Sequence, residues 1–375
     1  MGEAFFELIR GGKNSARRGA IRTFRGFVNT PAFMPVGSLG PVKTASPEEM
    51  ANLGAEIILN NAYHLYLRPG VETIRKAGGL HKFTGWDRPI LSDSGGFQFY
   101  SLEALKKIHN DGIEFQSHID GSKHFFSPEK VVDIQNDFGS DIMMPLDICL
   151  PSPAKIDEAR NAGELTIAWL RRSIDRLNSG ADLGGRKIFG IVQGSTFANL
   201  RAELAQRVRD LDLSGYAIGG LAVGEEKERM WEIVRVVNDT LPVDRPRYLM
   251  GVGTPADVVR AVSQGIDMFD CVMPTRNARN GTVFTRHGRI VLKGANYSQD
   301  NAPIQDGCGC YACRVFSRAY IRHLINVNEI LGLRLATIHN LHFYLKLMRD
   351  IREAISDGRF ENFMAEFLRD FESGT

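Results

Sequence analysis

The chain has 375 residues, of which 43% are hydrophobic and 24% are charged, and its formal net charge at pH 7 is +2. This composition is typical of a soluble globular protein with a large buried core. No apolar run is long enough to span a bilayer, and the first residues lack the basic and apolar regions of a signal peptide. We therefore expect a cytoplasmic protein without a membrane segment.

Eight short aliphatic runs along the chain predict buried strands. They are continuous rather than alternating, as expected of parallel strands that are covered on both faces. The runs cover residues 31–36, 55–60, 88–92, 140–147, 187–193, 215–220, 247–253 and 265–270. Helical spacing lies between most of them, for example over 157–178 and 196–212, and Ser46 and Glu49 form a capping box. The pattern predicts an α/β fold, an eight-stranded parallel β/α (TIM) barrel, with a doubly wound sheet as the alternative.

Two segments interrupt this regular alternation. Residues 112–126 alternate between apolar and polar side chains on either side of an Asp-Gly pair, which predicts a β-hairpin insertion. Residues of about 277–345, after the eighth strand, predict a small subdomain inserted into what is otherwise one barrel domain over 1–375. Apolar residues at helical spacing between 341 and 355 predict a closing helix, which we expect to start at His339.

Three of the five cysteines lie close together, at Cys308, Cys310 and Cys313. The odd total argues against a secreted disulfide framework and favours metal binding in a reducing compartment. Three thiolates at this spacing and one histidine form a closed tetrahedral zinc site, which is structural because no ligand position is left for water. We expect one such ion per chain with His339 as the fourth ligand. His342 and His323 are the competing histidines, and three buried free cysteines are the alternative without metal.

The basic residues are unevenly distributed. Between Arg276 and Arg322 the chain has eight Arg and Lys residues and two acids, which gives this zone a charge of +6 and the remainder −4. A confined basic zone on an acidic body suits a polyanion that is bound at one place. A solvated basic face is the plainer interpretation.

Polar residues follow the predicted strands at the ends where the active sites of such barrels lie. Three of them are the aspartates Asp93, Asp147 and Asp270, and Gln193 and Gly220 end two further strands. Carboxylates that share a site can divide into a nucleophile and an acid/base, because their environments separate their pKa values. Glycosyl chemistry needs this division. A carboxylate metal site or a sugar hydrolase would fit these residues almost as well.

Longer motifs distinguish between these possible functions. They are SDSGGFQ (92–98), GIVQGS (190–195), IGGLAVGE (218–225), YLMGVGTP (248–255) and FDCVMPTRNARNG (269–281), supported by NNAYHLYLRPG (60–70) and by HNLHFY (339–344) after the cysteines. Together, from about residue 5 to about residue 370, the chain resembles tRNA-guanine transglycosylases of the bacterial type. The resemblance implies a glycosyltransferase (pentosyltransferase). Such an enzyme replaces guanine at the wobble position of GUN tRNAs with 7-aminomethyl-7-deazaguanine, the queuosine precursor, through a covalent aspartyl-RNA intermediate.

The resemblance also implies roles for single residues. Asp270 matches the family's nucleophile, which attacks the anomeric carbon of the ribose. Asp93 matches the general acid/base that protonates departing guanine and deprotonates the incoming base. Asp147, Gln193 and the backbone of Gly220 match groups that hydrogen-bond the edge of the base.

Further matches surround these residues. Phe97 and Met250 match a pair that sandwiches the base, although their apolar character alone would favour a place in the core. Leu221, by its carbonyl, and Glu225 match positions near the exocyclic aminomethyl group, and Glu225 could instead simply begin a helix.

The resemblance extends to the partners. Arg276 and Arg279 match RNA-contacting residues, so the anticodon loop of a tRNA is the expected macromolecular partner beside the deazaguanine base. The family's zinc ligands fall on Cys308, Cys310, Cys313 and His339. The family forms homodimers, and we expect one here by that analogy.

One position departs from the family, which usually has Asp-Glu-Cys where this chain has Asp147-Ile148-Cys149. The lost carboxylate could alter the charge of the pocket and therefore the deazaguanine that is accepted. One alternative is therefore the same exchange with queuine itself. A separate alternative, suggested by a paralogue in the family, is a non-catalytic tRNA-binding partner subunit. Such a subunit would be expected to lose catalytic residues, whereas Asp93 and Asp270 are both present.

Overall fold

A closed barrel of eight parallel strands forms the centre of the computed structural model, which describes residues 4–13, 15–101, 106–179 and 185–374. The strands are β4 (Ala32–Gly37), β5 (Ile58–Asn61), β6 (Ile90–Asp93), β10 (Ile142–Met143), β11 (Lys187–Val192), β12 (Gly215–Ile218), β13 (Arg247–Leu249) and β14 (Met268–Cys271). They pair in the order β10-β11-β12-β13-β14-β4-β5-β6, and β6 pairs with β10 to close the ring. The predicted barrel is thus confirmed, and the doubly wound alternative is excluded.

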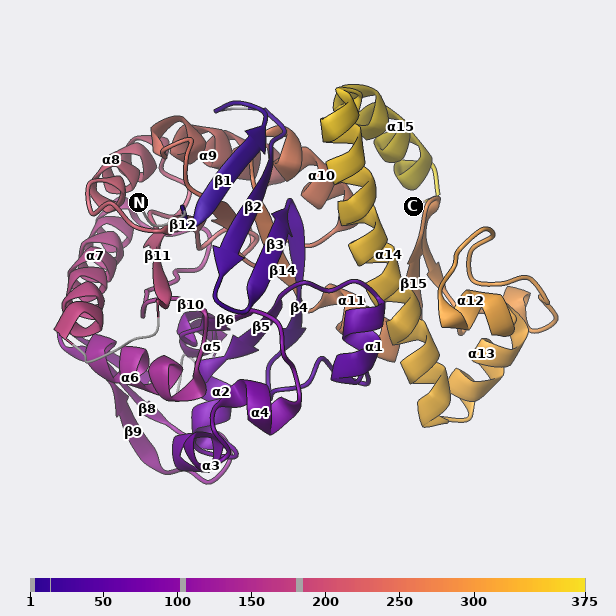
Figure 1. The fold of residues 1–375 in the computed structure, drawn as a ribbon, viewed down its shortest axis with the longest axis horizontal. Helices are drawn as coiled ribbons and strands as arrows, with labels where there is room; N and C mark the ends of the chain where they lie inside the picture. The colour runs from indigo at the N-terminus through magenta and orange to yellow at the C-terminus, as the bar shows by residue number, and fades with distance from the viewer. Residues whose placement is uncertain (1–3, 14, 102–105, 180–184, 375) are drawn as a thin grey trace.

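Helices surround the barrel, as Figure 1 shows. They are α1 (Pro47–Asn52), α2 (Ala62–Leu67), α3 (Val71–Lys76), α4 (Leu80–Thr84), α5 (Gly96–Ser101), α6 (Pro128–Phe138), α7 (Ile156–Ser179), α8 (Ala198–Arg209), α9 (Lys227–Thr240), α10 (Pro255–Ser263) and α11 (Met273–Arg279). The predicted capping box starts α1: the Ser46 hydroxyl accepts from the Glu49 N–H, and the Glu49 carboxylate accepts from the Ser46 N–H at 2.8 Å. The largest apolar cluster lies between the strands and helices α7 to α10 and continues into the C-terminal helices over residues 343–371.

The predicted hairpin is part of a three-stranded antiparallel sheet. Strands β8 (Gly112–Gln116) and β9 (Lys123–Phe126) form the hairpin, and β7 (Lys106–His109), which was not predicted, pairs with the other edge of β8. The buried rings of Phe115 and Phe126 lie 5.0 Å apart, and Phe115 also contacts Tyr63 at 5.3 Å. The sheet therefore packs on the start of α2, directly after β5.

A second antiparallel sheet, also not predicted, lies across the barrel strands (Figure 1). It contains β1 (Phe6–Arg10), β2 (Arg18–Thr23) and β3 (Gly26–Thr30). The side chains of Phe6, Ile21 and Val28 are buried in one cluster with residues of the barrel interior, such as Met34 and Ile191. Because β3 leads directly into β4, this sheet closes the barrel at the end where the strands begin.

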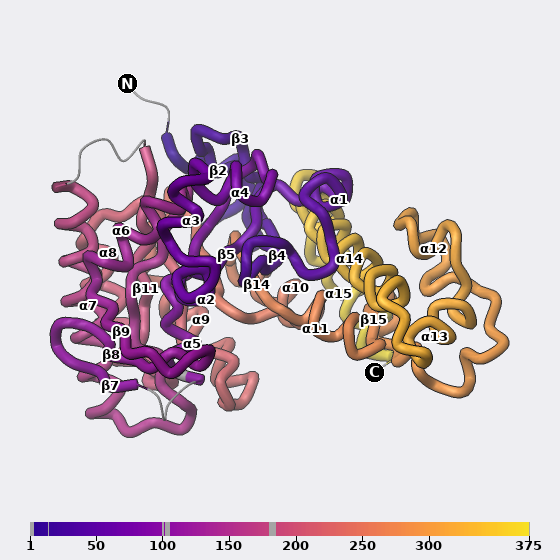
Figure 2. The backbone as a smooth tube through the Cα atoms, turned by 90° about the horizontal axis from the view of Figure 1, so that it is seen from below, coloured from indigo at the N-terminus to yellow at the C-terminus, as the bar shows by residue number. Residues whose placement is uncertain are grey.

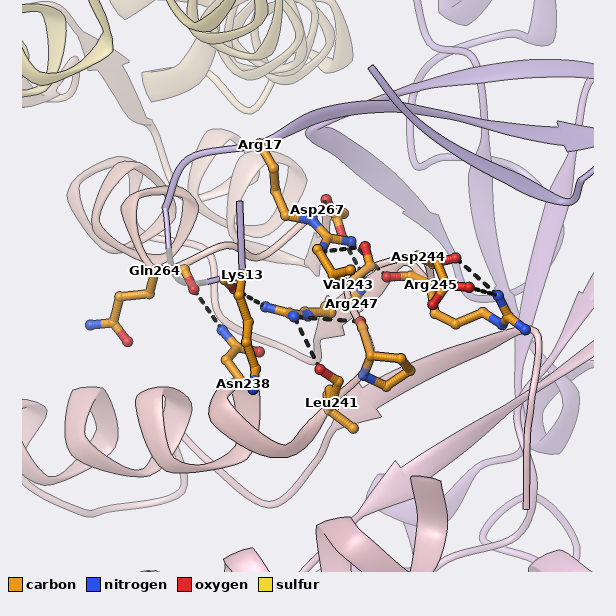
Figure 3. A network of polar contacts seen from close by, with 11 residues as sticks. Lys13, Arg17, Asn238, Leu241, Val243, Asp244, Arg245, Arg247, Gln264 and Asp267 are labelled. Atoms are coloured by element: carbon orange, nitrogen blue, oxygen red, sulfur yellow. Dashed lines mark hydrogen bonds and ion pairs between the residues drawn. The ribbon is translucent and has the colours of Figure 1, made fainter. Parts of the chain in front are cut away.

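Buried charges join this end of the barrel to the N-terminal segment (Figure 3). The Arg17 guanidinium binds the Asp267 carboxylate with two hydrogen bonds of 2.8 Å, and both side chains are fully buried. Asp267 also accepts the Arg247 N–H at 2.7 Å. The Arg247 guanidinium donates to the backbone carbonyls of Lys13 and Leu241. The buried Arg17–Asp267 pair is therefore hydrogen-bonded on several sides, as buried ions must be.

The residues after β14 form a small subdomain that projects from the barrel (Figure 2). Its elements are β15 (Thr282–Thr285), β16 (Gly288–Val291), a 3-10 turn (Ala295–Tyr297), α12 (Tyr311–Val315) and α13 (Arg318–Asn326). They enclose their own apolar cluster, which includes Val283, Leu292 and Ile321. The predicted small subdomain after the eighth strand is therefore present.

Helix α14 (Ile330–Asp357) connects the subdomain to the barrel, and α15 (Phe360–Glu372) ends the described fold. The prediction that the closing helix starts at His339 is wrong. The helix begins nine residues earlier, because Leu335 and Ala336 pack into the subdomain core and extend the buried face upstream. Among the described residues, no helix has the length and apolarity needed to cross a membrane.

Candidate functional site

A cavity of about 350 Å³ opens at the carboxyl ends of the barrel strands. Its volume is in the range of small-molecule sites. It is lined by nine of the residues that the sequence singled out for the active site: Asp93, Phe97, Asp147, Gln193, Gly220, Leu221, Met250, Asp270 and Arg276. Parallel strands account for this, because their carboxyl ends meet at one rim although the residues are far apart in sequence.

Asp270 lies near the end of β14 and is held at one of its two oxygens. Its Oδ1 accepts from the hydroxyl of Tyr248 at 2.6 Å and from the N–H of Gly251 at 2.8 Å. Burial raises the pKa of Asp270, and these two donors oppose the rise. Because both act on Oδ1, the second oxygen carries none of these bonds.

Asp93 ends β6 and is 9% exposed. The side-chain amide of Asn61, at the end of the adjacent strand β5, donates to Asp93 Oδ2 at 2.8 Å and to Gln98 Oε1 at the same distance. Burial raises the pKa of Asp93 to about 7, and the charges of Asp147 and Asp270 add to the rise. A carboxyl with such a pKa can exchange a proton close to neutral pH.

Asp147 follows β10 and accepts from the Gln193 side-chain amide at 2.7 Å. Burial raises its pKa to about 6, and the bond from Gln193 opposes that rise. The chain must pass very close to these groups. A Cβ on Gly96 would lie 2.0 Å from Asp147 Oδ1, and one on Gly220 would lie 2.3 Å from Gln193 Oε1. Glycine is therefore required at both positions if the carboxylate and the amide are to face the cavity.

The loop after β12 is folded around Glu225. Its carboxylate accepts from the N–H groups of Ala222 and Val223, the latter at 3.0 Å. Glu226, not Glu225, is the N-cap of α9. Glu225 is not among the lining residues of the cavity, whereas Leu221 is buried and lines it. The structure thus places Glu225 behind the loop and not in the cavity.

Phe97, in α5, and Met250, directly after β13, line the cavity. Phe97 is 53% exposed, which excludes the core position that its apolar character alone would favour. Ile148, by contrast, is buried in the outer apolar cluster, and its N–H donates to Thr166 Oγ1 at 3.1 Å. The residue that departs from the expected Glu therefore does not line the cavity.

The two arginines of α11 differ in position. Arg276 is exposed and lines the rim of the cavity. Arg279 lies one turn further along and is partly buried, with its Nε donating to the Thr275 carbonyl at 3.2 Å. Arg279 does not line the cavity itself. It is the last residue of α11, three residues before β15.

The three clustered cysteines and one histidine come together in the subdomain. One ligand atom of each of Cys308, Cys310, Cys313 and His339 lies within 4.8 Å of the others. The distances from His339 Nδ1 to the three sulfurs are 3.8, 3.5 and 3.3 Å, in that order. Bonds of ordinary length in a tetrahedral zinc site would place nitrogen and sulfur about 3.6 Å apart. The cluster can therefore hold a metal ion.

The second nitrogen of His339 supports the same arrangement. His339 Nε2 lies 2.8 Å from the Phe284 carbonyl of β15, so the ring donates there and turns Nδ1 toward the sulfurs. His342 Nδ1 lies 3.5 Å from Cys308 only. Neither His342 nor His323 belongs to the four-residue cluster. Of the three candidate histidines, His339 is thus the one that completes it.

Comparison with known proteins identifies the family. The family described as queuine tRNA-ribosyltransferase matches residues 13–373. The chain belongs to the queuine tRNA-ribosyltransferase family. It is 55% identical over 359 residues to the queuine tRNA-ribosyltransferase of Caldanaerobacter subterraneus subsp. tengcongensis, covering 96% of this chain and 95% of that protein. It is 53% identical to that of Dictyoglomus turgidum, over 98% of this chain and 94% of the relative.

Membership in this family decides between the classes of enzyme left open by the sequence. A relative from Pelotomaculum thermopropionicum, also named queuine tRNA-ribosyltransferase, is 52% identical over 99% of this chain and over its own whole length. The chain is accordingly a tRNA-guanine transglycosylase of this family and not a sugar hydrolase on the same barrel.

Some side-chain contacts within this cavity were not predicted from the sequence. Tyr248, inside β13, belongs to a predicted strand and begins the motif at 248–255, but no sequence signal marked its hydroxyl as a partner of Asp270. Asn61 directly follows the predicted strand 55–60, where site residues were expected, but its bond to Asp93 was not predicted. Cys149 lines the cavity, where burial raises the pKa of its thiol to about 12 and keeps it protonated.

Proposed function

We propose that this enzyme replaces guanine at the wobble position of GUN tRNAs with 7-aminomethyl-7-deazaguanine, through a covalent bond between Asp270 and the ribose. The observation that carries the proposal is the shared cavity, in which Asp93 and Asp270 lie in different hydrogen-bonding environments. Carboxylates with different proton affinities at one site can serve as nucleophile and acid.

In the first half-reaction, a carboxylate oxygen of Asp270 attacks the anomeric carbon of the ribose. The bond from that carbon to guanine breaks, the bond to Asp270 forms, and protonated Asp93 gives its proton to the departing guanine. Tyr248 and Gly251 hold Oδ1, so the other oxygen is the one available for attack. The ester keeps the RNA attached while the bases exchange.

In the second half-reaction, ionised Asp93 accepts a proton from the incoming deazaguanine as its nitrogen attacks the same carbon. The ester bond breaks, and Asp270 is regenerated as a carboxylate. Two displacements at one carbon restore the original configuration, as in retaining glycosidases. Asp93 alternates between acid and base, which its pKa near neutrality allows.

The base would be recognised by polar groups at its edge and apolar groups on its faces. Asp147, Gln193 and the Gly220 N–H supply acceptors and a donor, and Phe97 and Met250 stack on the two faces. The Leu221 carbonyl, with the loop braced by Glu225, would accept from the aminomethyl group. Because Ile148 does not line the cavity, the aminomethyl base remains our preferred substrate over queuine.

The tRNA would lie across the rim of the barrel and the subdomain. A base in an anticodon loop can be turned out of its stack at low cost, and Arg276 and Arg279 lie where its phosphates would pass. We take the chain as one barrel domain with an inserted subdomain over about 277–345, acting in the cytoplasm as a homodimer. Zinc, held by the Cys3His cluster, would fix the fold of that subdomain, since four protein ligands leave no open position.

Incorporation of labelled guanine into the wobble position of a GUN tRNA tests the reaction. Active protein should load the label, and a tRNA with adenine at that position should remain unlabelled. Absence of incorporation by metal-replete protein would refute the proposed exchange and would favour a non-catalytic tRNA-binding subunit. Competition between the aminomethyl base and queuine then decides between the two substrates, since a preference for queuine would contradict our assignment.

The metal assignment has its own test. Metal analysis of the purified protein should give one zinc ion per chain, and Cys310→Ala should lose it. Cys271→Ala, a buried cysteine outside the cluster, is the matched control and should retain the ion. Full retention of zinc by the Cys310 variant would refute the assigned ligand set.

A further inference from the structure

One buried arginine near the cavity binds backbone carbonyls. Arg201, in α8, is fully buried, and its guanidinium donates to three backbone carbonyls: Val192 at 2.7 Å, Ser195 at 2.7 Å and Gly220 at 3.3 Å. Within the described part of the chain, no carboxylate lies within ion-pair distance of it. Burial lowers its pKa to about 10, so the side chain still carries its charge at neutral pH.

The three carbonyls belong to the two loops that carry the base-contacting residues. The Val192 carbonyl is in the peptide that joins Val192 to Gln193, and the Gly220 carbonyl is in the peptide that joins Gly220 to Leu221. Gln193, Gly220 and Leu221 all line the cavity, whereas Arg201 does not. The arginine therefore binds the rear of the segments that would read the edge of the base.

These loops could not hold their shape by regular pairing. Gly194, Ser195, Gly220 and Ala222 all have positive φ angles, and Ser195 and Ala222 are not glycines. The Val192 carbonyl already accepts the Gly219 N–H at 3.1 Å, so Arg201 adds a second bond there, whereas the Ser195 and Gly220 carbonyls accept from Arg201 beyond the ends of the strands. A guanidinium can satisfy several carbonyls at once, because its five N–H groups project in fixed directions in one plane. The compact ammonium group of lysine cannot donate to three carbonyls in this planar arrangement.

We propose that Arg201 is a positioning residue for base recognition: by binding the carbonyls of Val192, Ser195 and Gly220, it fixes Gln193 and the Gly220–Leu221 peptide in the orientation that accepts the base. The inference rests on the proposed function, since it assigns these residues to the incoming and departing bases. A buried, unpaired cation is costly for stability alone. The three hydrogen bonds to the carbonyls offset part of this cost, and they lie directly behind the loops that would contact the base.

The test compares Arg201→Lys with Arg247→Lys. Arg247 is the matched control, because it is also fully buried and also binds backbone carbonyls, but at the opposite end of the barrel. Both variants should melt at a lower temperature than the unaltered enzyme. Arg201→Lys should in addition raise the KM for guanine about tenfold, the effect of one or two lost hydrogen bonds, while the KM for tRNA stays within about twofold. Arg247→Lys should leave both KM values unchanged.

Arg201→Gln, which retains two donors without the charge, is the second variant. An unchanged KM for guanine in a folded Arg201 variant would overturn the inference, as would equal increases in the KM for guanine and for tRNA. Failure of both Arg201 variants to fold would make the residue structural and would also overturn it. Activity of the unaltered enzyme is measured first, so that failure of the proposed exchange is distinguished from failure of this inference.

Discussion

The two ends of the barrel treat buried charge in opposite ways. Where the strands begin, Arg17 and Asp267 form a two-bond ion pair, and Asp267 also binds the backbone of Arg247 (Figure 3). Where the strands end, Asp93, Asp147 and Asp270 face a cavity, and no described Lys or Arg forms an ion pair with them. The first arrangement stabilises the fold, whereas the second leaves proton affinity and charge available for chemistry.

Neutralising one aspartate at each end gives the largest expected difference between the two ends. Asp270→Asn should lower the rate of base exchange roughly 10⁴-fold or more, the usual scale for a lost nucleophile, because an amide cannot form the ester. It should also abolish the RNA adduct that survives denaturation. Asp267→Asn should leave the rate within a few fold and should lower the melting temperature, because Arg17 loses its counter-ion. Rates and melting curves on both variants make the test.

Two outcomes would contradict the proposed division between a catalytic end and a stabilising end of the barrel. A denaturation-resistant adduct in Asp270→Asn would assign the nucleophile to another residue. A loss of activity in folded Asp267→Asn as large as that in Asp270→Asn would show that the two ends are not separate in function.

The next largest effect concerns stability alone. Arg17→Met should destabilise the protein by about 3–5 kcal/mol, because it leaves the Asp267 carboxylate buried without its cation. It also removes the donors to the Val243 and Arg245 carbonyls. Denaturant titration measures the loss, and Arg10→Met, on the exposed part of β1, is the control. A loss below about 1 kcal/mol would show that this network is not a main support of the N-terminal sheet.

The contrast between the ends also explains which parts of the fold could be predicted. The eight barrel strands were predictable because burial on both faces requires continuous apolar runs. The β1–β3 sheet was not, because it buries only one face and its strands include charged residues such as Arg18 and Arg22. The start of α14 was predicted too late, because the apolar residues at 341–355 mark only the part that packs on the barrel. Its first turns pack on the subdomain core instead.

Within the site, the same logic applies to single residues. Asp93, Asp147 and Asp270 were predictable because each follows an apolar run, and a parallel barrel brings those ends together. Arg201 was not, since it stands between Leu200 and Ala202 in an amphipathic helix, where a charge is usually exposed. Tyr248 was hidden for the complementary reason: a tyrosine within an apolar strand gives no sign of what its hydroxyl binds.

The pH dependence of adduct formation sharpens the comparison further. In the proposed mechanism, this step requires ionised Asp270 and protonated Asp93. Since burial and the neighbouring carboxylates raise the pKa of Asp93 to about 7, the rate should fall about tenfold per pH unit above that value. It should also fall in acid, as Asp147, with a pKa raised to about 6, and Asp270 take up protons. Single-turnover rates from pH 5 to 9 give the profile. A rate that is constant from pH 6 to 9 would remove Asp93 as the acid.

The smallest effect is a gain in stability from removing a catalytic charge. Burial raises the pKa of Asp93 from its ordinary value to about 7, so between about pH 4 and 7 the folded state holds a proton that the unfolded state has released. Stability must therefore fall as the pH rises through this window. Asp93→Asn cannot ionise, so it should stabilise the protein at pH 8 by about 1–2 kcal/mol, net of the weaker hydrogen bond with Asn61.

Melting curves at pH 8 and pH 4.5 measure this gain, which should be about 2 °C at the higher pH and should vanish at the lower one. Asp141→Asn is the matched control at the opposite end of the barrel. That carboxylate accepts the Ile90 N–H at 2.9 Å and lies 3.3 Å from the His81 ring, so its loss should destabilise the protein at pH 8. If both variants destabilise equally, the carboxyl end of the barrel stores no unfavourable charge, and the physical contrast between the two ends does not hold.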